Sequence, residues 1–174
     1  MQTMQTSDKS MMQCQIMKHL KDMKKSNTSP CHNVCFRLMW FFASMVLVSF
    51  VLNEIWEMAQ MSAYVVTVGH SWTSNLALCT QATLGDVEIV LGIYATNALA
   101  TGDLGWGLRG RWNIYAAMAV QGLVYATLLK HAALSAGQWT YTEQMPIVPV
   151  LAAGLWPLLQ MTFLPPLTVW IARR

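Results

Sequence analysis

The chain has 174 residues, of which 55% are hydrophobic and only 11% are charged. Because a soluble domain usually carries about 25% charged residues, this composition excludes an ordinary soluble protein and predicts a polytopic membrane protein. The net charge is +3, and five Lys residues together with Arg37 precede the first apolar segment. That distribution is typical of a cytoplasmic membrane anchor, so we expect the lipid bilayer as a partner and no nucleic acid.

Residues 1–36 are predicted to form a polar, Met-rich cytoplasmic tail, with a short basic amphipathic helix over residues 15–25 on the inner membrane surface. Alternative start codons could account for part of this tail. The spacing of Cys31 and Cys35 would suit two metal ligands, and the Met residues near Cys14 and His19 would suit copper. No second ligand pair follows the two cysteines, so we assign no metal site and leave any cofactor open.

Four apolar segments follow, at about residues 38–62, 83–101, 112–131 and 147–171. Each is close to or above the ~20 residues that a helix needs to cross the hydrocarbon core of a bilayer. The connections are short, so sequential helices should be antiparallel. The predicted fold is therefore all-α, an up-down bundle of four transmembrane helices over residues 37–174. Pro157 would lie inside the fourth helix and bend it.

The positive charges predict the orientation of this bundle. The segments 63–82 and 132–146 contain no Lys or Arg, whereas the loop after the second span carries Arg109 and Arg111 and the chain ends in Arg173 and Arg174. Cytoplasmic loops are enriched in Lys and Arg. We therefore expect both termini to be cytoplasmic, in a bacterial inner (plasma) membrane.

Two carboxylates, Glu54 and Glu57, lie where the first span approaches the outer side. A charge at the centre of a bilayer costs roughly 2.5–3.5 kcal/mol on insertion scales, so such residues are usually functional. The spacing i, i+3, i+4, i+7 places a set of polar and aromatic residues on one helix face. These residues are Asn53, Trp56, Glu57, Gln60 and Tyr64.

The second span should return from the outer side with Asp86 in its first turn, at the depth of Glu57. Thr83 and Asp86 resemble a capping box, which would be a purely structural role. Thr83 and Asp86 share one helix face, whereas Glu88 points away from it. The same outer region should receive polar and aromatic residues from the third span, the following loop and the fourth span. These further candidates are His131, Trp139, Tyr141, Glu143 and Gln160, with His70 as a less certain member; each could instead serve at the interface or in helix packing.

The order of these motifs resembles that of a group of small bacterial four-span membrane proteins of uncharacterised function. The motifs are Asn53-x-x-Trp56-Glu57-x-x-Gln60, Cys79-Thr80, Gly85-Asp86, Trp139-x-Tyr141, Met145-Pro146 and the closing "GLWPLLQMTFLPPLTVW". This resemblance covers residues 40–172 and implies a fold and a location but no activity. Asn53, Trp56 and Glu57 are also similar to a string in the membrane-bound terpene cyclases of meroterpenoid pathways, where the glutamate is thought to donate a proton.

Three functions are compatible with the sequence. The first is an acid/base or ligand-binding site for a lipid-soluble or periplasmic small molecule, since neighbouring carboxylates that are partly desolvated cannot all stay ionised. Glu57 would be the acid with Asp86 or Glu54 as its partner, Trp56 and Tyr64 would shield the site, and Gln60 and Tyr141 would orient the ligand. The second is an accessory subunit or assembly factor of a larger membrane complex, or a homo-oligomer. The third is cation or copper handling.

Overall fold

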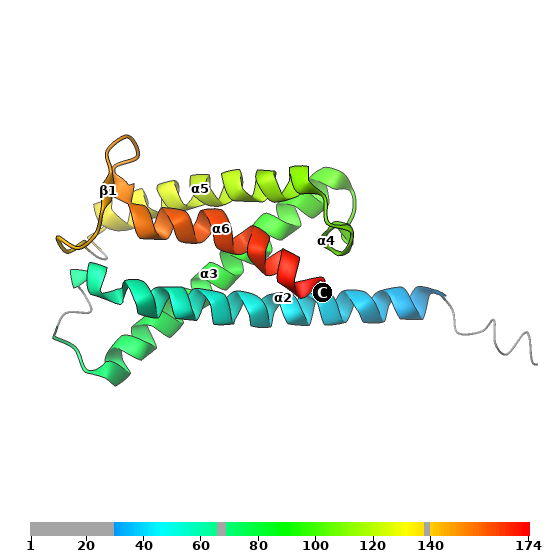
Figure 1. Cartoon of the computed structure of the whole chain (residues 1–174), viewed down its shortest axis with the longest axis horizontal. Coiled ribbons are helices and arrows are strands. Elements are labelled where there is room, and N and C mark those ends of the chain that lie inside the picture. Colours follow the sequence, from blue (N-terminus) through cyan, green and yellow to red (C-terminus); the bar gives the residue numbers. More distant parts are fainter. Residues whose placement is uncertain (1–29, 66–68, 138–139) are drawn as a thin grey trace, which may run out of the picture. The chain divides into compact units, whose positions relative to one another are not determined.

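The computed structural model of the chain describes residues 30–65, 69–137 and 140–174. Within these residues the fold is all-α, as predicted, with one short hairpin (Figure 1). The elements in chain order are α2 (Pro30–Gln60), the 3-10 helix η1 (Met61–Ala63), α3 (Trp72–Thr101), α4 (Trp106–Arg109), α5 (Trp112–Ser135), β1 (Ile147–Val148), β2 (Ala153–Gly154) and α6 (Leu155–Ala172). The amphipathic helix predicted at 15–25, and the metal-ligand candidates Cys14 and His19, lie outside the described residues.

The chain divides into two compact units between Trp40 and Phe41. The first unit contains the beginning of α2, where the rings of Phe36 and Trp40 lie 6.1 Å apart in an edge-on arrangement. The second unit contains the rest of α2 and every later element. All the residues of the candidate site described below belong to this second unit.

Four helical segments are long and apolar enough to cross a membrane: Val34–Ala63, Trp72–Thr101, Trp112–Ala133 and Leu155–Ala172. The shortest has 18 residues, which at ~1.5 Å per residue approaches the ~30 Å thickness of the hydrocarbon core. Each corresponds to one of the four predicted spans. Together they indicate a multi-pass membrane protein.

Helix α3 begins at Trp72, well before the start predicted at residue 83. Ser71 is its N-cap, and the Ser71 hydroxyl accepts a hydrogen bond from the backbone N–H of Ser74 at 3.3 Å. Residues 72–82 are rich in Ser, Thr, Asn and Gln, which are also frequent in loops. Their weak helix propensity is overcome by the Ser71 cap and by continuation into the apolar part of α3. The prediction that Asp86 occupies a first turn, in a capping box with Thr83, is therefore wrong. Asp86 lies at the middle of α3.

The fourth predicted span also begins at a different place, because residues 147–154 form a hairpin and not a helix. Strand β1 pairs antiparallel with β2, with Ile147 opposite Gly154 and Val148 opposite Ala153. In a short apolar segment, the periodicity of the sequence cannot tell a strand from a helix. Since α6 starts at Leu155, Pro157 lies in its first turn, where its missing N–H has no helical partner in any case. The predicted interior kink at Pro157 is wrong, and the interior prolines of α6 are Pro165 and Pro166.

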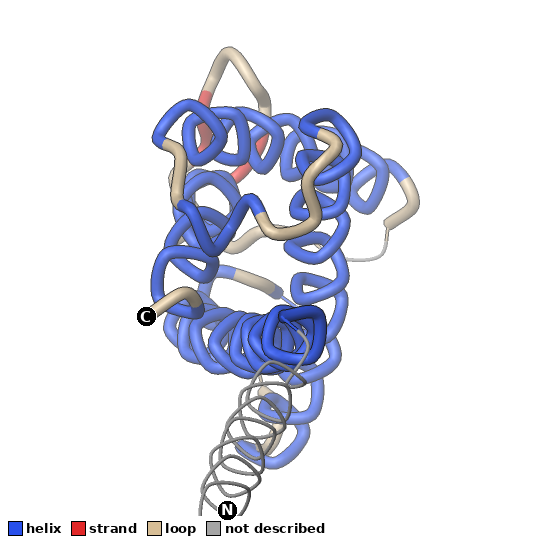
Figure 2. The backbone as a smooth tube through the Cα atoms, turned by 90° about the vertical axis from the view of Figure 1, so that its right-hand side faces the viewer, coloured by secondary structure: helices blue, strands red, loops and turns tan. Residues whose placement is uncertain are grey.

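Helices α5 and α6 lie side by side, and α3 crosses the bundle obliquely (Figures 1 and 2). The closest approach is at Gly122 of α5, where a Cβ atom would overlap the backbone carbonyl of Met161. A residue without a side chain at this position allows the two helix backbones to approach closely. The hairpin, red in Figure 2, packs beside α5 and α6.

An aromatic core closes the opposite end of the second unit. Trp106 of α4 is 1% exposed and stacks on Tyr94 of α3, with ring centroids 4.7 Å apart. The Tyr94 hydroxyl donates a hydrogen bond to the carbonyl of Leu104 at 2.6 Å. Phe41 and Met118 add to the same cluster. The Gly-rich loop after α3 is thereby anchored to the bundle.

Candidate functional site

The polar face of α2 points into the bundle, as its spacing predicts. Asn53, Glu57 and Gln60 are buried in spite of their polarity. The side-chain amide of Asn53 donates to the backbone carbonyl of Ser49 at 2.8 Å and lies 3.3 Å from the Ser49 hydroxyl. With both amide hydrogens directed to its own helix, Asn53 presents its carbonyl oxygen to the other helices.

Gln160 of α6 connects this face to α3. Its amide nitrogen donates to Asn53 Oδ1 at 3.0 Å and to Asp86 Oδ2 at 2.7 Å. Its carbonyl oxygen accepts from Gln60 Nε2 at 3.0 Å. Gln160 is only 1% exposed, so it is a buried junction between α2, α3 and α6.

Glu57 joins the same network through Gln60, whose amide nitrogen donates to Glu57 Oε1 at 2.8 Å. The two carboxyl groups of Glu57 and Asp86 are therefore linked by the amides of Gln60 and Gln160. They come from different helices and from positions 29 residues apart in the sequence. The structure therefore brings together Glu57 and Asp86, which the sequence named as candidates for one site. We refer to Asn53, Glu57, Gln60, Asp86 and Gln160 as the carboxyl–amide network.

Glu54 lies beside this network and has a partner of its own. Its Oε1 accepts a hydrogen bond from the Thr80 hydroxyl at 3.1 Å. Glu54 and Asp86 both remain partly exposed, whereas Glu57 is buried. A molecule in the surrounding phase could thus approach Glu54 and Asp86 without first unpacking the helices.

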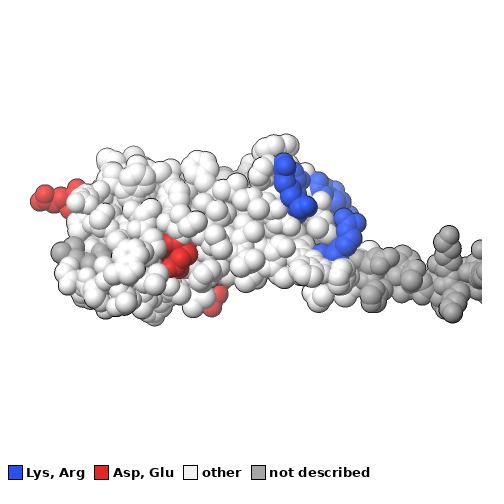
Figure 3. Space-filling view, turned by 60° about the horizontal axis from the view of Figure 1, so that its bottom comes forward, with Lys and Arg blue, Asp and Glu red and all other residues white. Residues whose placement is uncertain are grey.

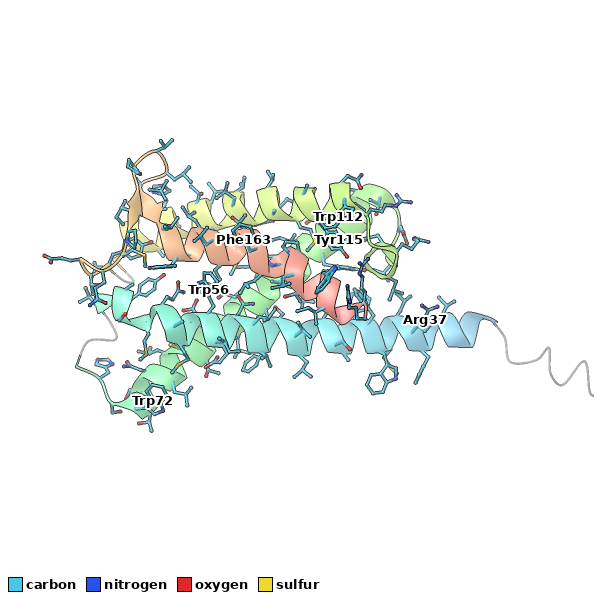
Figure 4. The ribbon with its side chains drawn as sticks, viewed as in Figure 1. Arg37, Trp56, Trp72, Trp112, Tyr115 and Phe163 are labelled. Atoms are coloured by element: carbon cyan, nitrogen blue, oxygen red, sulfur yellow. The ribbon has the colours of Figure 1, made fainter. Side chains whose placement is uncertain are left out.

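Several buried polar atoms around the network have no hydrogen-bond partner in the part of the chain that the structure describes. They are Glu54 Oε2, Trp56 Nε1, Gln60 Oε1 and Thr83 Oγ1. Trp56, labelled in Figure 4, shares the polar face because it lies three residues after Asn53 and four before Gln60. Thr83 is one helical turn from Thr80 and from Asp86. Buried polar atoms are rarely left unpaired, so this set of donors and acceptors suits a bound water or a polar group of a ligand.

Two tyrosines meet beyond the end of α2, next to the network. Tyr64 and Tyr141 form an isolated antiparallel bridge, and their rings are 5.6 Å apart. Val65 and Thr142 extend this pairing through backbone hydrogen bonds of 3.0 Å to Thr140 and Ala63. Burial, and then the negative charge of Glu57, raise the pKa of the Tyr64 phenol. Burial also raises the pKa of Tyr141, partly offset by the hydrogen bond that the Gly154 N–H donates to its oxygen.

These tyrosines predict a loss of stability at alkaline pH. The unfolded chain releases a tyrosine proton near pH 10, whereas folded Tyr64 holds its proton to higher pH. This contribution to stability is fully present below about pH 10 and is lost as the pH rises above it toward the folded pKa. Thermal unfolding in detergent between about pH 9 and pH 11 should show a falling midpoint, with a smaller fall in Tyr64→Phe. An equal fall in both proteins would contradict this assignment.

Other predicted members lie away from the network. His131 is exposed, and its Nε2 is 2.7 Å from the backbone carbonyl of Leu151. Glu143, Glu88 and His70 are exposed as well. Trp139 lies outside the described residues, so its predicted role stays a prediction. The structure thus brings together the candidates from α2, α3 and α6 and leaves His131 and Glu143 at the periphery.

Sequence reasoning missed two partners of the site, Ser49 and Thr80. Thr80 was recognisable, because it lies one helical turn before Thr83, which was itself a candidate. Ser49 precedes Asn53 by four residues, which is the usual spacing for such a side-chain contact on a helix. A second buried amide pair, Asn97 Nδ2 to Gln121 Oε1 at 2.9 Å, joins α3 to α5 elsewhere in the bundle.

On the face shown in Figure 3, basic side chains gather at one end, and Asp and Glu side chains lie toward the other. An ion pair joins Arg109 and Asp103 at the basic end. Among the described residues, no ion pair reaches Glu57, and no group of three or more His, Cys, Asp or Glu side chains could hold a metal ion.

Comparisons with protein-family models, with curated proteins and with solved structures found no match for this chain. The resemblances to bacterial four-span proteins and to terpene cyclases therefore stay predictions.

Proposed function

We propose that the chain is a multi-pass protein of the bacterial inner membrane whose carboxyl–amide network is an acid/base or ligand-binding site for a lipid-soluble or periplasmic small molecule. The observation that carries this proposal is the chain of hydrogen bonds from Glu57 through Gln60 and Gln160 to Asp86. It links two carboxyl groups through neutral amides. In this proposal one of the two carboxyl groups holds a proton, which it can transfer to a bound molecule.

The surroundings of the network support a ligand. Trp56 Nε1 offers a donor, Gln60 Oε1 and Glu54 Oε2 offer acceptors, and all three atoms are buried without a partner among the described residues. Asp86 lies at the middle of an apolar helix and is partly exposed, which suits access from the lipid phase. The tyrosine pair would shield the site from the outer solution.

The distribution of charge supports the proposed orientation. Arg109 and Arg111 lie in the connection between α3 and α5, and Arg173 lies against it at Gly110. The carboxyl–amide network lies toward the other end. If the basic end is cytoplasmic, as the positive-inside rule favours, the site belongs to the outer half of the membrane.

The geometry favours this function over a cation site. A hard cation would need several carbonyl or carboxylate oxygens directed at one point. In the network, Asn53 Oδ1 and Gln160 Oε1 already accept hydrogen bonds from amide nitrogens. Of the amide oxygens of Asn53, Gln60 and Gln160, only that of Gln60 has no hydrogen-bond partner among the described residues. One free amide oxygen is too few for a hard cation.

Infrared spectroscopy of the purified protein tests the proposal. Ordinary Asp and Glu side chains are ionised at pH 7, because their usual pKa is about 4. If the network holds a proton, wild type should keep the carbonyl band of a protonated carboxyl at pH 7. Glu57→Gln and Asp86→Asn should each remove or shift that band, whereas Glu88→Gln, at an exposed position of α3, should leave it unchanged. No protonated-carboxyl band in wild type at pH 7 would overturn the acid/base proposal.

Native mass spectrometry in a mild detergent separates this function from that of a subunit. A site-bearing protein should appear as a monomer or homo-oligomer, with Glu57→Gln leaving its assembly unchanged. A partner of fixed stoichiometry that is lost in Glu57→Gln would favour a role in a larger complex.

A further inference from the structure

The basic end of the second unit contains a second convergence of polar groups, far along the helices from the carboxyl–amide network. It lies where the loop between α4 and α5 meets the end of α6. Arg109 is neutralised by its ion pair with Asp103. The structure describes no such ion pair for Arg111, Arg173 or Arg174, so this end carries an excess of positive charge.

Arg173 is held in a defined position. Its guanidinium lies over the ring of Tyr115, 5.8 Å from the ring centroid. The same guanidinium fits against Gly110, where a Cβ atom would overlap its Nη1. Gly110 has a φ of +59°, which favours glycine for a second reason. The close approach of backbone and guanidinium therefore depends on this residue.

The hydroxyl of Tyr115 lies at the same point. Tyr115 is only 8% exposed, and its oxygen is buried without a hydrogen-bond partner among the described residues. That oxygen would be 3.4 Å from a Cβ atom on Gly110, next to the guanidinium of Arg173. In Figure 4 Tyr115 and Trp112 are seen beside each other near the start of α5, with ring centroids 6.0 Å apart.

A buried phenol donor beside a guanidinium is suited to one chemical class of ligand. A guanidinium binds phosphate oxygens in a bidentate manner, and a hydroxyl can donate a further hydrogen bond. Basic pockets between transmembrane helices at a membrane surface bind the head groups of anionic lipids. Tryptophans such as Trp112 and Trp170 prefer that depth, and the guanidinium of Arg174 lies 4.0 Å from the ring centroid of Trp170.

We propose that Arg173 and Tyr115 form a binding site for a phosphate-bearing anion, presented by the head group of an anionic membrane lipid. The site is independent of the carboxyl–amide network and does not require the proposed acid/base function. Arg173 binds the phosphate oxygens, and the Tyr115 hydroxyl donates to one of them after a small movement of Arg173. Arg111 adds positive charge around the site, whereas Arg174 is directed to the ring of Trp170.

The test is native mass spectrometry of the detergent-solubilised protein, titrated with phosphatidylglycerol or with phosphatidylcholine. Wild type should bind phosphatidylglycerol at least about fivefold more tightly. Arg173→Gln should reduce that binding about tenfold, because it removes the positive charge, and Tyr115→Phe about threefold, because it removes one hydrogen-bond donor and keeps the charge. Arg174→Gln is the matched control, because it removes the same charge from the adjacent position.

A parallel arm uses inorganic phosphate alone and follows the thermal unfolding midpoint. Stabilisation of wild type but not of Arg173→Gln by inorganic phosphate would support the site with a free anion as its ligand. Preference for phosphatidylglycerol without that stabilisation would support a lipid ligand. Equal binding of the two lipids with no effect of phosphate would overturn the proposal. Equal losses in Arg173→Gln and Arg174→Gln would overturn it too, because they would indicate a diffuse charge effect.

Discussion

Replacing Gln160 with Leu should lower the free energy of unfolding by about 2–4 kcal/mol. The substitution keeps the size of the side chain but removes its hydrogen bonds to Asn53, Asp86 and Gln60. Each bond between helices in a membrane protein contributes about 0.6–1.5 kcal/mol, and buried partners that are left unpaired add to the loss. Unfolding by sodium dodecyl sulfate in mixed micelles, followed by far-ultraviolet circular dichroism, measures this change.

Gln121→Leu is the matched control. Gln121 makes one hydrogen bond to another helix, to Asn97, and the Asn97 amide keeps its bond to the carbonyl of Ile93 at 2.8 Å. Its loss should cost about 1 kcal/mol or less. If Gln160→Leu were no more destabilising than Gln121→Leu, the junction between α2, α3 and α6 would not form as described. The Gln160 variant should also alter the carboxyl band in the infrared, whereas the Gln121 variant should not.

The sequence predicted the four helices and the polar face of α2 because both depend on local patterns. Long apolar segments have few alternatives to helices in a membrane, since every backbone polar group must be paired within the segment. The spacing of Asn53, Glu57 and Gln60 places them on one face of any helix. Their burial confirms that this face is directed into the bundle.

The depth of Asp86 could not be predicted in this way. It depends on where α3 begins, and residues 72–82 contain many Ser, Thr, Asn and Gln residues, which are also frequent in loops. The cap at Ser71 and the oblique path of α3 place Asp86 at mid-helix (Figure 1). The role of Gln160 as a junction could not be predicted either, because its three partners are at least 74 residues away in the sequence.

The start of α6 affects the site as well. The sequence prediction included residues 147–154 in the fourth helix, which made that helix longer and placed Pro157 in its interior. In the structure those residues form the hairpin, and the Leu155 N–H donates to the carbonyl of Pro146 at 2.8 Å. Gln160 is consequently near the beginning of α6, on the side of the bundle where Tyr64 and Tyr141 meet. This explains why Gln160, which looked central in the predicted span, contacts Asn53 and Gln60 near the C-terminal end of α2.

Replacing Gly122 with Ala should lower the free energy of unfolding by about 3 kcal/mol. At this point α5 approaches α6 so closely that a Cβ atom would overlap the carbonyl oxygen of Met161. The neighbouring atom belongs to the backbone, so no side chain can rotate away, and the helices must separate. Overpacking of this kind typically costs about 1–3 kcal/mol and occasionally more. The same mixed-micelle unfolding experiment measures the loss.

The control for this prediction is the same chemical change at a helical glycine with free space. A Cβ atom on Gly92 of α3 would meet nothing within 4 Å, and the position is exposed. Gly92→Ala should therefore be neutral or stabilising by up to about 1 kcal/mol, because alanine has the higher helix propensity. Equal effects of the two substitutions would contradict the close packing of α5 on α6. Since Gln160 immediately precedes Met161, separation of these helices should also displace the amide junction, and Gly122→Ala should weaken the protonated-carboxyl band that Gly92→Ala leaves intact.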